Sequence, residues 1–202
     1  MPRVSAAYRA ARRDHILAAA STCFARDGFH RATIQDVIDE AGMSPGAVYR
    51  YFRTKDEIIA AISLDATAMV ETAVRDALRT RQPLPALFAR LPRTLAALDH
   101  ADDRFRLAVQ AWGEALRNPT LAAAMQHGLR GVHDALRERI AQGQAEGEVA
   151  AAVHPAAAAG VLLSLLQGFI LQTAWQSELS ADVYGDAASA VIAGQLSAGP
   201  AD

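Results

Sequence analysis

Ten residues near the N-terminus, MSPGAVYRYF, combine small residues with groups that bind phosphates and bases. Tyr49 and Tyr51 carry hydroxyl groups on rigid stems, and such groups can bond to phosphate oxygens. Arg50 carries a guanidinium whose paired donors fit O6 and N7 of guanine. The preceding small residues would let a helix end approach base edges closely; they are Ser44, Pro45, Gly46 and Ala47. This stretch therefore favours recognition of double-stranded DNA.

The two tyrosines also have a structural interpretation, as core aromatics whose hydroxyls reach the surface. That interpretation suits one of them better than both, because residues two apart on a helix do not share a face. We expect Val48 and Phe52 to point into a small core instead. Lys55, the only lysine of the chain, stands at the start of the next helix, where its ammonium could meet a phosphate.

A pair of short helices is predicted to position these side chains. Thr33 begins the first one, TIQDVIDEA, with Asp36 at capping-box spacing, and Gly42 ends it. Ser44 caps the second, and Pro45 takes its first position, where a missing N–H costs nothing. The short turn AGMS joins them, so the two predict a helix-turn-helix, whose second helix enters the major groove of DNA.

The rest of the chain also predicts helices. Its 202 residues are 51% hydrophobic but only 6% aromatic, so the interior must be largely Ala, Leu, Val and Ile, which favours helix and supplies a sizeable core. Thr54 with Glu57 predicts a capping box before a long helix. We expect an all-α protein of about nine helices. Besides the pair above, they cover residues 9–26, 55–80, 86–98, 102–117, 119–144, 155–179 and 182–196.

Charge divides the chain into two parts. Residues 1–55 carry a balance of +4 and residues 56–202 a balance of −6. A basic DNA-binding domain over 1–55 and a larger ligand-binding and dimerisation domain over 56–202 would explain this asymmetry, although chance scatter could produce it as well. The single cysteine, Cys23, excludes an internal disulfide and fits a reducing compartment. We expect no signal peptide, because no long apolar run follows the first basic residues. We expect a cytoplasmic protein.

Nothing in the sequence favours an enzyme. The six histidines are scattered, and none has the i, i+4 spacing of a metal-binding helix. No GxSxG, phosphate-binding loop or dinucleotide fingerprint occurs. We therefore expect no catalytic residue, no metal and no cofactor.

The segment GFHRATIQDVIDEAGMSPGAVYRYFRTKDEII closely resembles the N-terminal domain of the TetR family of transcriptional regulators. The match covers about a quarter of the chain and departs from the family pattern at Ala32, where a hydroxyl residue is common. FRLAVQAWGEALRNPTLAAAM and GQAEGEV are similar to the C-terminal domain of a common subgroup. The resemblance implies phosphate contacts by Thr33, Tyr49, Tyr51 and Lys55, and base contacts by Gly46, Ala47 and Arg50.

Residues 156–175 carry no charge, and their length alone would span a membrane. Ser164, Gln167 and Gln172 within the run, and the lack of Arg or Lys after Arg139, argue against that. A buried helix at a dimer interface fits better. The resemblance implies a four-helix bundle made by the last two helices of two chains, to which we assign Leu162, Leu165, Leu166, Phe169, Trp175, Val191 and Ile192, some of which will face the monomer core.

The resemblance also implies a ligand pocket among the central helices, where Phe88, Phe105, Trp112 and Met125 lie. Plain core packing explains each of them equally well. The whole sequence therefore predicts a homodimeric repressor that binds a pseudo-palindromic DNA operator and is released by a small-molecule effector. The alternatives are an all-helical carrier of hydrophobic ligands without DNA function and a membrane-anchored regulator.

Overall fold

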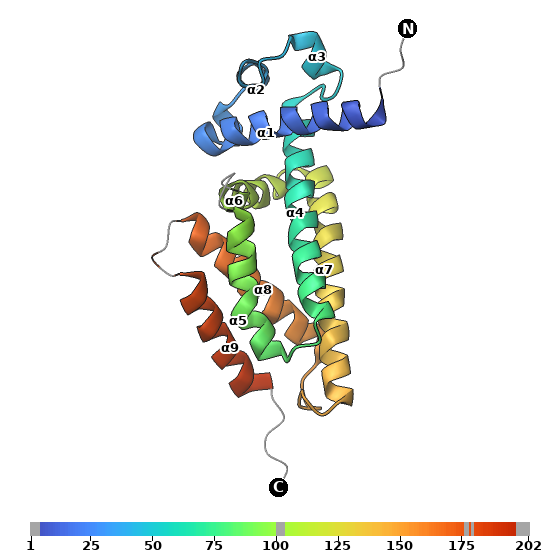
Figure 1. Cartoon of the computed structure of the whole chain (residues 1–202), viewed down its shortest axis with the longest axis vertical. Coiled ribbons are helices and arrows are strands. Elements are labelled where there is room, and N and C mark those ends of the chain that lie inside the picture. Colours follow the sequence, from blue (N-terminus) through green and yellow to red (C-terminus); the bar gives the residue numbers. More distant parts are fainter. Residues whose placement is uncertain (1–4, 100–103, 176–177, 179, 197–202) are drawn as a thin grey trace.

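The computed structural model describes residues 5–99, 104–175, 178 and 180–196, which form nine α-helices and no strand (Figure 1). The predicted all-α class is confirmed. The helices are α1 (Ala6–Arg31), α2 (Ile34–Glu40), α3 (Pro45–Tyr49), α4 (Lys55–Arg79), α5 (Leu84–Asp99), α6 (Arg104–Ala115), α7 (Pro119–Ala145), α8 (Pro155–Ala174) and α9 (Ala181–Leu196). In Figure 1, α1 to α3 form one end of the molecule, and α4 runs from that end alongside α7.

Glycine 28 breaks α1, as the sequence predicts. Gly28 has φ 79°, a conformation that L side chains rarely adopt, and the chain makes one further turn before α2. The helix begins three residues earlier than predicted, because the Ser5 side chain accepts a hydrogen bond from the Tyr8 amide at 3.1 Å. The helix predicted over 182–196 corresponds to α9. The helix predicted over 155–179 corresponds to α8, which ends at Ala174, and residue 179 lies outside the described residues.

The helix caps follow the sequence fully at Thr33, in part at Thr54 and not at Ser44. Thr33 and Asp36 form both halves of a capping box, and the hydrogen bonds from Thr33 lower the pKa of Asp36. Thr54 accepts from the Glu57 amide, but the Glu57 carboxylate accepts from the Arg53 amide at 2.7 Å instead of closing the box. Ser44 precedes α3 without a side-chain cap, and its carbonyl alone accepts from the helix.

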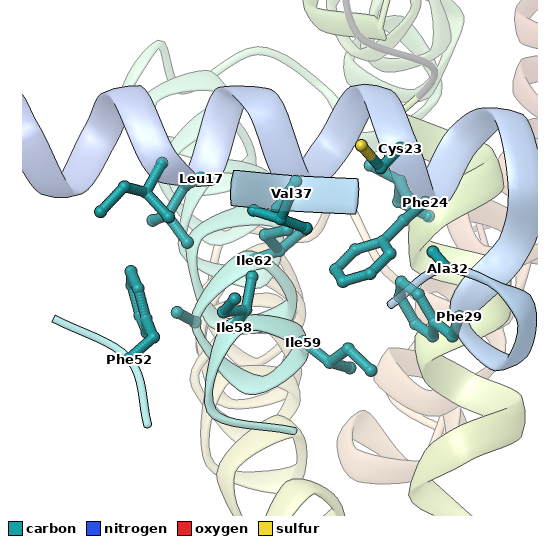
Figure 2. Packing of buried hydrophobic residues seen from close by; sticks show 14 of the residues in the cluster. Leu17, Cys23, Phe24, Phe29, Ala32, Val37, Phe52, Ile58, Ile59 and Ile62 are labelled. Carbon is teal, nitrogen blue, oxygen red and sulfur yellow. The ribbon is translucent and has the colours of Figure 1, made fainter. Parts of the chain in front are cut away.

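Two groups of buried residues form the interior. The first, which we call the upper core, joins α1 to α4 with residues of α6 and α7; Figure 2 shows Phe24, Phe29 and Val37 within it. Cys23 is fully buried there. The second, the lower core, joins α5 to α9 with part of α4. In the lower core α9 lies close against α5 at Gly185, where a Cβ would lie 2.3 Å from the Ala89 carbonyl oxygen. The absence of a side chain at Gly185 therefore permits this close approach.

A buried ion pair connects the α4–α5 loop to α7. The Arg139 guanidinium donates to the Glu148 carboxylate at 2.5 Å and to the Gln82 carbonyl at 3.1 Å. Glu148 in turn accepts from the Leu84 amide at 3.0 Å. The Arg139 side chain is only 7% exposed, so its charge needs the Glu148 carboxylate as a counter-charge. The same carboxylate holds the end of the α4–α5 loop through the Leu84 amide.

Candidate functional site

A surface hollow of about 350 Å³ lies between the start of α1 and the start of α3. Five of its residues belong to the predicted DNA-binding set: Ser44, Gly46, Ala47, Arg50 and Tyr51. The others are Tyr8, Arg12 and Met43. We call this set of eight the α1–α3 hollow. It brings an arginine fork, small residues and a tyrosine hydroxyl to one surface.

Two buried side chains fix the orientation of α3. Val48 and Phe52 are buried in the upper core, as predicted. Tyr51 is half-buried and packs against the same core. It is therefore in part a core aromatic whose hydroxyl reaches the surface. Tyr49 is 45% exposed and Pro45 is exposed, so both present their side chains to solvent.

Sequence reasoning missed Tyr8 and Arg12. The Arg12 Nε donates to the Tyr8 hydroxyl at 3.1 Å, and the guanidinium lies 5.5 Å from the centre of the Tyr8 ring. The hydrogen bond to Tyr8 raises the pKa of Arg12, a side chain that is cationic at neutral pH without any shift. The signal in the sequence is the i, i+4 spacing of a tyrosine and an arginine in a basic N-terminal helix.

Lys55 and Thr33 lie apart from the hollow's residues and already have partners. The Lys55 ammonium donates to the carbonyls of Phe29 at 2.7 Å and Ala32 at 3.1 Å, with His30 at 3.5 Å. The Thr33 hydroxyl accepts from the Asp36 amide and donates to its carboxylate at 2.8 Å. Lys55 therefore ties the end of α1 to the start of α4.

An inner cavity lies between α4, α6, α7 and α8. Phe105, Trp112 and Met125 line it, as the sequence predicts for a pocket, and the wall is mostly apolar. Its volume is about 50 Å³, so a ligand of ten or more atoms requires its walls to move apart. Phe88 does not line this cavity; it is 1% exposed and packs in the lower core, as the core-packing alternative predicts.

A larger groove of about 710 Å³ runs between α4 and α5. Its volume is in the range of small-molecule sites. Leu87 and Leu91 form apolar parts of its wall, while Asp76 and Arg90 are polar parts. Met69 lines both this groove and the inner cavity, so it separates the two.

The predicted dimer residues divide into two groups. Leu162, Leu166, Phe169 and Ile192 are buried in the lower core, so they are the members of the set that face the monomer core. Apolar residues at these positions stabilise the monomer. Leu165 is half-buried, whereas Trp175 is 71% and Val191 is 58% exposed. Other large exposed apolar residues on the same two helices are Val161 and Val183.

Comparisons with known proteins identify the family. A family model described as bacterial regulatory proteins of the tetR family matches residues 16–62, which include α2 and α3. A second, described as the C-terminal part of BetI-type transcriptional repressors, matches residues 86–197, more than half of the chain. The chain belongs to the TetR family. It is a DNA-binding transcriptional regulator.

Individual relatives of the TetR family extend along almost the whole chain. An uncharacterized HTH-type transcriptional regulator of Bacillus subtilis, YfiR, is 30% identical over 204 residues, which cover 95% of this chain and 94% of the relative. The solved structure of Salmonella enterica GusR superposes with a TM-score of 0.73 at 25% identity and covers 96% of this chain and 99% of its own. SmeT from Stenotrophomonas maltophilia, solved with triclosan, has the same fold, with a TM-score of 0.75, 23% identity and coverage of 93% and 92%.

The uncharged segment of the sequence forms most of α8. Among the described helices, α8 is long and apolar enough to cross a membrane, and 33% of its most apolar stretch is buried inside the structure. Leu162, Leu166 and Phe169 account for part of that burial. Packing in the lower core therefore explains part of its apolar character.

Proposed function

We propose that the protein is a cytoplasmic, homodimeric repressor that binds a pseudo-palindromic operator and leaves it when a small molecule binds. Residues 1–55 would form the DNA-binding domain and residues 56–202 the domain for ligand binding and dimerisation. The observation that carries the proposal is the α1–α3 hollow, which combines cationic and hydroxyl groups with the close-approach residues of α3.

Within this proposal, base edges meet α3 and phosphates meet its surroundings. Gly46, Ala47 and Arg50 face the bases, because small residues permit close approach and a guanidinium can read guanine. The phosphate contacts come from hydroxyl and cationic groups around them: Tyr8, Arg12, Ser44, Tyr49 and Tyr51, with Pro45 packing beside the backbone. A phosphate contact by Thr33, which the family resemblance implies, would have to replace the hydrogen bond from its hydroxyl to the Asp36 carboxylate.

We assign Lys55 a positioning role instead of the phosphate contact that the family resemblance implies. Two carbonyls within 3.1 Å of its ammonium take most of its donor capacity. Because those carbonyls belong to the segment that leads into α2, Lys55 acts on DNA binding through the orientation of the helix-turn-helix.

The second copy would pack against the exposed apolar residues of α8 and α9. Val161 on α8, Trp175 just after its end, and Val183 and Val191 on α9 are each more than half exposed in the single chain. Burial of large apolar side chains is the main favourable term in association. A two-fold axis there would present two copies of α3 to half-sites about 34–36 Å, or a multiple of that, apart.

The effector site would comprise the α4–α5 groove and the inner cavity, with Met69 as their common wall. SmeT, which has this fold, accommodates triclosan. An effector that binds better to a conformation with mismatched helix spacing lowers operator affinity by its differential affinity for the two states. A carrier without DNA function would use the same cavities but would make the α1–α3 hollow irrelevant.

The test is affinity for an operator selected from random DNA and for a scrambled duplex, across about 50 to 200 mM salt. Wild type should prefer the operator, and binding should weaken steeply with salt. Arg12→Ala should weaken binding to both duplexes and reduce the salt slope, whereas Arg130→Ala, an exposed arginine on α7, should change neither. If wild type binds both duplexes weakly and equally, the repressor proposal is wrong and the carrier of hydrophobic ligands is the remaining interpretation.

A further inference from the structure

We infer that Gln110 of α6 is a positioning residue for the helix-turn-helix and carries the state of the inner cavity to it. The inference rests on the proposed regulation of DNA binding by an effector. It concerns one contact between α6 and the end of α1. Figure 1 shows α6 beside that end of α1.

The peptide groups of Phe29 are held from two sides. The Phe29 amide donates to Gln110 Oε1 at 2.9 Å, and Gln110 Nε2 donates to the Phe24 carbonyl at 3.4 Å. The Phe29 carbonyl accepts from Lys55 at 2.7 Å. Gln110 thus supplies an acceptor to an amide that lies just beyond the helix break at Gly28.

Phe29 leads directly into the helix-turn-helix. Its side chain is 4% exposed and lies edge-on against Phe24, with ring centres 5.1 Å apart. Figure 2 shows these two residues beside Ala32 in the upper core. Ala32 precedes Thr33, the cap of α2, so only three residues separate Phe29 from the cap. A displacement of the Phe29 peptide therefore displaces α2 and the attached α3.

The opposite face of α6 lines the inner cavity. Phe105, Ala108 and Trp112 contact that space. Gln110 lies across the helix from them, because residues two apart on a helix differ by about 200°. The cavity of about 50 Å³ cannot admit an effector-sized molecule unless a wall moves. A shift of α6 as a packed element would move Gln110 against Phe29.

The test combines amide hydrogen exchange with a double-mutant cycle on the full-length dimer. Gln110→Met keeps the side-chain volume and removes both hydrogen bonds. It should accelerate exchange of the Phe29 amide and weaken operator binding about fivefold, the factor that one ordinary hydrogen bond supplies. Gln110→Glu keeps the acceptor for Phe29 and should restore slow exchange. Gln126→Met, an exposed position on α7, should leave both readouts unchanged.

Ala108→Leu serves as the probe of the cavity, because it overfills a space of about 50 Å³ without a ligand. It should weaken operator binding tenfold or more in the wild-type background and at most about twofold in Gln110→Met. Ala108→Met, a more flexible side chain, replaces it if the first variant is insoluble. Equal losses in both backgrounds, or Phe29 exchange unaffected by Gln110→Met, would overturn the inference. The proposed function fails separately, if wild type shows no preference for the operator.

Discussion

Replacing Lys55 with methionine tests whether this lysine supports the fold or binds DNA. Methionine keeps the length and much of the apolar stem but removes the ammonium. In the structure that ammonium bonds to the carbonyls of Phe29 and Ala32, at 2.7 and 3.1 Å, and approaches that of His30 at 3.5 Å. All three carbonyls lie between the break in α1 and the start of α2.

The magnitude follows from the two shorter bonds. A hydrogen bond from a charged group contributes about 1.5–3 kcal/mol net, and the half-buried site exposes part of each carbonyl to water. Allowing for that solvation, Lys55→Met should lower the free energy of unfolding by about 2–4 kcal/mol. This is a large part of the roughly 5–15 kcal/mol that stabilises a typical domain.

Urea unfolding measures the stability, and operator affinity across a salt series measures the phosphate contacts. We expect the loss of stability with the salt slope unchanged. Arg53→Met, an exposed cation close by, is the control and should leave stability unchanged. If Lys55→Met unfolds like wild type while the slope falls by about two units per dimer, the lysine binds one phosphate in each half-site and the positioning role is refuted.

Three further substitutions test other parts of the account. Arg50→Ala should cost about 1–3 kcal/mol per half-site on the operator and much less on random DNA; equal losses in competition binding would make Arg50 a phosphate contact. Glu148→Leu should lower the free energy of unfolding by about 3–5 kcal/mol, because it leaves Arg139 buried without a counter-charge, and denaturation at wild-type urea concentration would contradict this. Val191→Asp should sediment as a monomer while Leu116→Asp, 89% exposed in the turn between α6 and α7, stays dimeric; a dimeric Val191→Asp would remove α9 from the interface.

Local signals in the sequence predicted the helices well. Thr33 with Asp36, and Pro45 at the start of α3, act within one or two turns, so their effect does not depend on distant contacts. Glu57 was predicted less well, because the Arg53 amide was a competing donor one residue earlier. The positions of the small residues on α3 followed from the same local pattern.

The orientation of α8 could not be predicted from the sequence. Its residues are apolar on every side, so no stripe distinguishes the core face from an exposed face. Contacts with α6, α7 and α9 decide that Leu166 and Phe169 are buried while Val161 is exposed. The role of Lys55 was hidden for a related reason, since its carbonyl partners lie more than twenty residues away.

Selection of DNA from a random library by the purified protein tests the central claim most directly. We predict enrichment of a pseudo-palindrome whose two half-sites are separated by one helical turn of DNA or a multiple of it. Binding to that sequence should be at least about a thousandfold tighter than to its scrambled version at physiological salt. Recovery of DNA without any common sequence, or equal affinity for the two duplexes, would contradict the claim that this chain is an operator-binding regulator.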